Sequence, residues 1–103
     1  MKVLTVKSAD VLDEEIQLDV HHAFGMEHHT DYVFKPRGDR EYSATIVLED
    51  TGPVIERMIE ESKAFPGSVF IIDDLDMEAN TIERYHVKAG YVKERLRSGW
   101  KWG

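Results

Sequence analysis

Residues 41–73 read EYSATIVLEDTGPVIERMIEESKAFPGSVFIID, and this stretch decides the fold. In residues 41–49 apolar side chains alternate with polar ones, which is typical of a strand with one buried face. Thr51 and Pro53 then mark a helix start, and apolar residues recur at helical spacing up to a Phe-Pro-Gly sequence. The continuous apolar run in residues 69–72 is typical of a central strand. The stretch therefore predicts a strand, a helix and a second strand.

Upstream of this stretch, residues 2–7 are short, apolar and β-branched, so they predict a strand. Residues 29–35 predict another strand. They are separated from residues 41–49 by a Gly-containing turn, so we expect the two runs to pair as an antiparallel hairpin.

Residues 10–24 fit two structures. As a helix, they place Leu12, Ile16 and Val20 on one stripe, with Ser8 or Asp10 as the cap and Gly25 after the end. As a strand, they show a clean alternation of apolar and polar side chains. We favour the helix because termination signals stand at both of its ends.

Downstream, residues 73–80 are rich in carboxylates and predict an acidic loop. Residues 81–93 predict one long strand with a bulge or bend at Ala89-Gly90, where the alternation breaks. Residues 95–103 predict either a further edge strand or an extended C-terminal segment.

These elements predict a single small α+β domain over residues 1–103, built mainly from an antiparallel sheet with one or two helices. With the helical option for residues 10–24, the order is split βαβ-like with an extra C-terminal strand. With the strand option, the alternative is a β-barrel or sandwich with one helix.

Composition limits the function. The 103 residues include no cysteine, which excludes disulfide scaffolds, thiol catalysis and Cys-zinc modules. The sequence contains no apolar stretch of membrane-spanning length, no secretory signal, no nucleophile elbow and no phosphate-binding loop. We therefore expect a soluble protein that is cytoplasmic or within a virion, that is not secreted and is not an enzyme, and that needs no cofactor.

The charge is unevenly distributed along the chain. Residues 1–83 hold seven basic and 19 acidic side chains, whereas residues 84–103 hold six basic and one acidic. Aromatic and cationic side chains alternate near the end, and such residues are enriched at interface hot spots. The residues expected to bind a partner are Tyr91, Lys93, Arg95, Arg97, Trp100, Lys101 and Trp102.

The main hypothesis from this pattern is a protein-interaction or assembly module that docks through its basic aromatic C-terminal segment. It would be a structural or accessory subunit of a larger, viral-type particle, and its partner an acidic protein surface or another copy of the chain. We do not expect direct nucleic-acid binding, because the acidic body would repel phosphates.

Two alternatives remain at this point. The first is an acidic inhibitor that imitates nucleic acid and binds a basic nucleic-acid-binding protein. The second is a metal-binding protein that uses the cluster of His21, His22, His28 and His29. For such a divalent metal the expected ligands are His22, His28 and Asp31, because two imidazoles and a carboxylate suit zinc-like ions.

Overall fold

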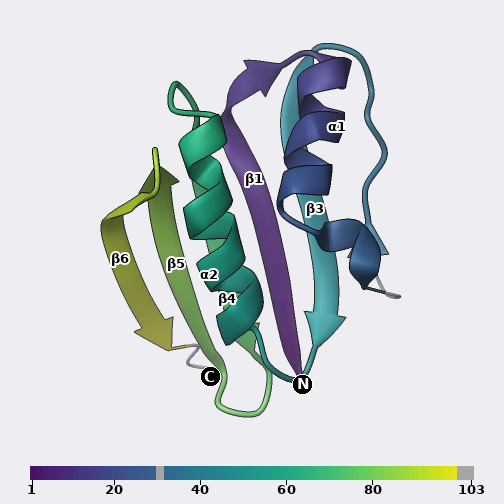
Figure 1. The fold of residues 1–103 in the computed structure, drawn as a ribbon. Helices are drawn as coiled ribbons and strands as arrows, with labels where there is room; N and C mark the ends of the chain where they lie inside the picture. Colours follow the sequence, from purple (N-terminus) through teal and green to yellow (C-terminus); the bar gives the residue numbers. More distant parts are fainter. Residues whose placement is uncertain (30–31, 100–103) are drawn as a thin grey trace.

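A computed structural model describes residues 1–29 and 32–99 of the chain. Its strands form one six-stranded antiparallel sheet in the order β2-β3-β1-β4-β5-β6, and both helices lie on the same face of that sheet (Figure 1). The prediction of an α+β fold with a mainly antiparallel sheet and one or two helices is confirmed, and the described residues form two α-helices. In chain order the elements are β1 (Lys2–Leu12), α1 (Glu14–Ala23), the 3-10 turn η1 (Met26–His28), β2 (Tyr32–Val33), β3 (Arg40–Leu48), α2 (Gly52–Glu61), the 3-10 turn η2 (Ser62–Ala64), β4 (Val69–Asp76), β5 (Thr81–Lys88) and β6 (Tyr91–Gly99).

The first strand of the chain lies inside the sheet. β1 pairs antiparallel with β3 on one side and with β4 on the other, so that Val6 lies opposite both Ala44 and Ile72. The helix α2 connects β3 to β4 across the face of β1 (Figure 1). Among the described strands, β2 and β6 form the two edges.

The hydrophobic core fills the space between the sheet and the two helices. Phe24 from the end of α1 packs edge-on against Phe70 of β4, with ring centroids 5.0 Å apart. Alternate residues of each strand point into this layer, as strand geometry requires. The core consists of Leu4, Val6, Leu12, Val20, Phe24, Met26, Tyr42, Ala44, Ile46, Val54, Ile55, Met58, Phe70, Ile72 and Val87.

The helical option for residues 10–24 is confirmed, but its start and its buried face differ from the prediction. β1 runs on to Leu12, and Asp13 rather than Ser8 or Asp10 caps α1 by accepting the Ile16 N–H at 2.8 Å. Gln17 is buried in place of Ile16, because its amide donates to the carbonyl oxygens of residues 12, 38 and 40.

Two predictions for the C-terminal half are wrong. The acidic residues 73, 74 and 76 belong to β4, so the loop before β5 is only the short turn at 77–80. Residues 81–93 are not one bent strand, because the chain reverses at Ala89 and Gly90, whose φ angles are +51° and +85°. Two consecutive positive φ angles are typical of the tight turns that join hairpin strands.

Within the strand predicted at 29–35, the described strand is Tyr32–Val33, which pairs with β3 as expected for the hairpin, while residues 30 and 31 lie outside the described residues. The described helices are both ten residues long, and none is long and apolar enough to cross a membrane.

Candidate functional site

The C-terminal segment forms the edge strand β6, which pairs with β5 and with no other described strand. Residues 91–98 are all exposed. An edge strand presents a row of backbone N–H and C=O groups that can pair with an added strand. Of the segment at 95–103, residues 95–99 belong to this edge strand, which already begins at Tyr91, and residues 100–103 lie outside the described residues.

Part of the basic charge of this segment is matched within the molecule. Arg95 forms an ion pair with Glu83 across the β5–β6 ladder, and its guanidinium lies 5.2 Å from the centre of the Tyr85 ring. Burial raises the pKa of Glu83, but hydrogen bonds from Arg95 and Tyr85 and the charges of Arg95 and Arg97 outweigh it and leave the pKa below its usual value. Arg95 therefore stabilises the pairing of β6 with β5 within one molecule, independently of any partner.

A second internal pair lies one strand further in. Arg84 of β5 donates to both carboxylate oxygens of Asp73 in β4, at 2.7 and 2.9 Å. This two-pronged geometry is the stronger form of an ion pair, and it raises the pKa of Arg84. Among the described residues, Lys93 and Arg97 make no ion pair, although Arg97 lies opposite Glu83 in the ladder and its charge helps to lower the pKa of that carboxyl.

The aromatic part of the predicted site is described at one position. The Tyr91 side chain is 67% exposed, and the Lys93 ammonium lies 5.7 Å from its ring centre. The other three predicted partner-binding residues, Trp100, Lys101 and Trp102, lie outside the described residues.

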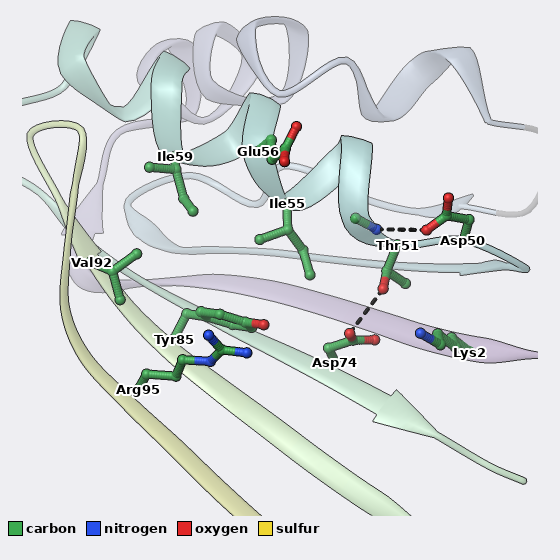
Figure 2. Close-up of a pocket in the computed structure, with 11 residues that line it drawn as sticks. Lys2, Asp50, Thr51, Ile55, Glu56, Ile59, Asp74, Tyr85, Val92 and Arg95 are labelled. Atoms are coloured by element: carbon green, nitrogen blue, oxygen red, sulfur yellow. Dashed lines mark hydrogen bonds between the residues drawn. The ribbon is translucent and has the colours of Figure 1, made fainter. Parts of the chain in front are cut away.

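A pocket of about 490 Å³ lies beside β6, between α2 and the sheet (Figure 2). Ile55, Ile59 and Val92 form its apolar wall, and Arg95 and Asp74 supply charges of opposite sign. The Thr51 hydroxyl donates to Asp74 Oδ2 at 2.8 Å, whereas Asp74 Oδ1 is buried without a hydrogen-bond partner among the described residues. The sequence analysis missed this pocket, because Asp74 and Thr51 come from separate elements.

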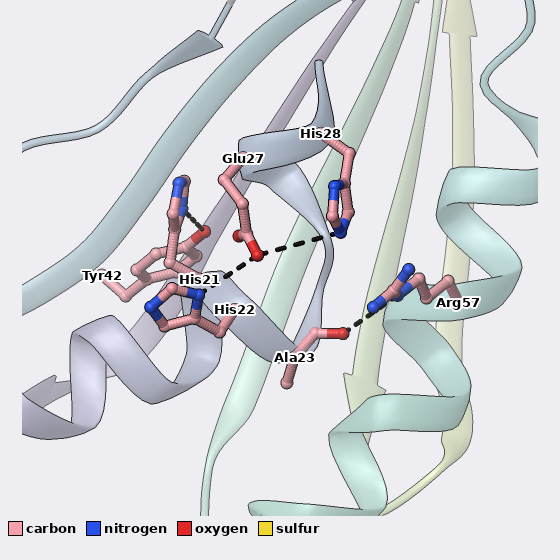
Figure 3. A network of polar contacts seen from close by, with 7 residues as sticks. All are labelled: His21, His22, Ala23, Glu27, His28, Tyr42 and Arg57. Atoms are coloured by element: carbon pink, nitrogen blue, oxygen red, sulfur yellow. Dashed lines mark hydrogen bonds and ion pairs between the residues drawn. The ribbon is translucent and has the colours of Figure 1, made fainter.

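The four predicted histidines do not share one environment. His21 is buried, stacks on Phe34 with ring centroids 4.2 Å apart, and its Nδ1 lies 2.9 Å from the Tyr42 hydroxyl (Figure 3). Burial lowers the pKa of His21, although the nearby Glu27 carboxylate opposes this effect. Burial likewise raises the pKa of Tyr42. His21 is therefore a buried polar residue whose burial disfavours the charged imidazole.

His22 and His28 converge on the carboxylate of Glu27 (Figure 3). The His22 Nδ1 lies 3.1 Å and the His28 Nε2 3.9 Å from the same Glu27 oxygen. Within residues 1–29 and 32–99, no three His, Asp or Glu side chains are placed to hold a metal ion, and the third predicted ligand, Asp31, lies outside the described residues. The described contacts place the Glu27 carboxylate between the two imidazoles.

Two neighbouring carboxylates of the acidic stretch, Asp73 and Asp74, do not share one surface. Asp73 and Asp74 are successive residues of β4, so their side chains point to opposite faces of the sheet. Asp73 is occupied by Arg84, and Asp76 accepts the backbone N–H groups of Glu78 and Ala79 at 3.0 and 3.1 Å. The hydrogen bond from Ala79, above all, lowers the pKa of Asp76 despite the opposing effect of burial.

We compared the chain with protein-family models, with curated proteins and with solved structures, and none of the three comparisons gave a match.

Proposed function

We propose that this protein is a non-enzymatic interaction module, a small accessory or structural subunit, that docks a partner protein along β6. The observation that carries the proposal is the exposed nine-residue edge strand with Lys93 and Arg97 on it. Strand addition to such an edge takes its affinity from backbone hydrogen bonds, and its side chains select the partner.

The charges of β6 favour an acidic partner segment over a second β6. Three cations and one carboxylate, Glu94, lie on this strand, which gives it a charge of +2 within a chain of −7. Antiparallel pairing of two such strands would bring like charges together, which destabilises cross-strand pairs. Lysine on an edge strand also discourages uncontrolled pairing between copies, so the same residues select against the wrong partner.

The rest of the fold supports β6 as a platform. The connection of β3 through α2 to β4, with β1 between the two strands, favours the split βαβ-like interpretation with β5 and β6 as a C-terminal addition. In this arrangement the added hairpin extends the sheet beside α2, and the outer edge of β6 pairs with no described strand.

A labelled acidic peptide tests the proposal. The probe is a fluorescein-labelled nonapeptide of alternating Glu and Val, and its counterpart replaces each Glu by Lys. We expect the acidic probe to bind and to perturb the backbone amide NMR signals of residues 91–99. Binding should weaken as salt rises, because the attraction is between exposed charges.

Matched variants locate the binding. The double substitution Lys93→Glu and Arg97→Glu should weaken probe binding by at least about tenfold. The control is Lys35→Glu with Arg37→Glu, which changes the net charge equally in an exposed loop away from β6. Equal loss of binding in both variants, or amide shifts centred outside β6, would contradict the proposal.

A further inference from the structure

Both helices lie on one face of the sheet (Figure 1), and no described element covers the opposite face. Many side chains of that opposite face are apolar. The buried residues Leu4 and Val6 fix which side of β1 faces the helices, so Val3, Thr5 and Lys7 point to the other side. The strand register then places the remaining residues of this open face. Its apolar members are Val3, Val11, Val33, Val47, Val69, Ile71, Leu75, Ile82, Tyr91 and Leu96.

These side chains form rows across the strands. One row runs from Val47 through Val3 and Leu75 to Ile82, so that an aliphatic band crosses four neighbouring strands. A sheet face that meets water normally carries polar residues, which makes this band unusual for a free surface. Contiguous apolar patches of this kind mark interaction sites.

The charges on the open face balance one another. Lys7, Arg84 and Lys88 stand against Glu41, Asp73 and Glu94, while Lys93 at the β6 bulge adds one positive charge at the rim. The net charge of the chain is −7, so its excess of carboxylates lies elsewhere. Two copies of this chain repel each other over most of their surfaces, but not over this face.

We propose that the open sheet face is a homodimer interface, in which two copies pack sheet against sheet with their helices outermost. Strands lie about 4.8 Å apart and rise about 3.3 Å per residue, so five strands of eight or more residues present a projected area on the order of 600 Å². The accessible surface is larger than this projected area because side chains protrude from the sheet. It is therefore close to the roughly 800 Å² per partner of a standard interface.

The geometry of this dimer keeps the acidic helices apart. Packed sheets are about 10 Å apart, and a helix layer about 10 Å thick lies on each outer side. The acidic surfaces of the two copies are therefore separated by about 30 Å, which exceeds the screening length of about 8 Å at physiological salt. A second copy thus fits the face without electrostatic cost, whereas a strongly charged partner gains nothing from it.

Light scattering after size exclusion tests the oligomeric state of the whole chain. We expect a mass twice the 11.9 kDa of one chain, and a dimer that persists at high salt because its interface is apolar. Leu75→Lys, in the middle of the aliphatic band, should give a folded monomer. The control Leu18→Lys introduces the same charge at an exposed leucine of α1 and should remain dimeric.

Spin labels settle the geometry even if Leu75→Lys fails to fold. The chain has no cysteine, so Thr5→Cys labels the centre of the open face alone. Face-to-face packing puts two such labels within about 25 Å, whereas pairing of two β6 edges separates them by about 34 Å. A monomer at every concentration, a dimer that Leu75→Lys leaves intact, or the longer label distance would each overturn the proposal. Docking of an acidic segment on β6 would be unaffected by any of these outcomes.

Discussion

Replacing Tyr42 by phenylalanine removes the hydroxyl that lies 2.9 Å from His21 Nδ1, in a part of the core where both side chains are buried. His21 Nε2 already lacks a hydrogen-bond partner among the described residues. The Tyr42→Phe variant would therefore leave both ring nitrogens of a buried imidazole unpaired.

The expected cost follows from these contacts. A buried polar group left without its partner costs about 1–3 kcal/mol, and here the lost group is a single neutral hydrogen bond, so we expect about 1–2 kcal/mol. For a domain of this size that loss lowers the melting temperature by roughly 5–15 °C. The His21→Leu substitution should lower the free energy of unfolding by a similar amount, because it leaves the Tyr42 hydroxyl without its hydrogen-bond partner.

The decisive measurement is a double-mutant cycle by urea denaturation at about pH 8, where His21 is neutral. The double variant removes both polar partners at once, and we expect it to be about 1 kcal/mol more stable than the two single losses added together. Simple additivity within about 0.3 kcal/mol would show that the two side chains do not interact, and would refute the structural reasoning.

Three further predictions concern pH, the β5–β6 turn and the tie between that turn and α2. Because burial lowers the pKa of His21, the unfolded chain binds more protons than the folded chain below about pH 6.5, so the free energy of unfolding should fall between about pH 7 and pH 5. The urea midpoint should fall less over this range in His21→Leu, and an equal dependence of the midpoint on pH in both proteins would contradict this prediction. Ala89→Asn should raise the free energy of unfolding by about 0.5–1 kcal/mol, since asparagine tolerates the positive φ angle; a lower melting temperature would count against it. Ser62→Ala should cost about 1–3 kcal/mol and loosen β6 in hydrogen exchange, because the Ser62 hydroxyl accepts the Gly90 N–H at 2.8 Å; unchanged exchange at Gly90 would argue against the tie.

The sequence predicted best where periodicity is local. Residues 41–49 alternate strictly, and Tyr42, Ala44 and Ile46 are buried as that alternation requires. The helix α2 begins at Gly52, between Thr51 and Pro53, as these residues predict. The Thr51 hydroxyl, however, donates to Asp74 and does not cap the helix, so the position was predicted correctly and the contact was not.

Prediction failed where a residue acts through distant groups or in an unusual conformation. Gln17 is buried because it reaches carbonyls more than 20 residues away, which no helical period reveals. The turn between β5 and β6 was not predicted because Ala89 occupies a position with a positive φ angle, which alanine rarely adopts. An Asn-Gly sequence at this position would have indicated the turn. The ion pair between Arg95 and Glu83 could not be predicted, because it depends on β6 folding back on β5.

The open face was equally invisible from the sequence. Val3, Leu75 and Ile82 become neighbours only when the register of three strands is known. The charge asymmetry along the chain overstates the positive charge that β6 presents to a partner, because Arg84 and Arg95 already form ion pairs within the molecule.

The position of β1 has a consequence for biosynthesis. β1 needs partners on both of its sides, and the second of them, β4, ends only at Asp76. Synthesis must therefore continue through β4 before the nascent chain can pair both edges of β1. A stalled or prematurely terminated product that lacks β4 would display one edge of β1 unpaired, and an unpaired strand edge is prone to aggregation and to chaperone binding.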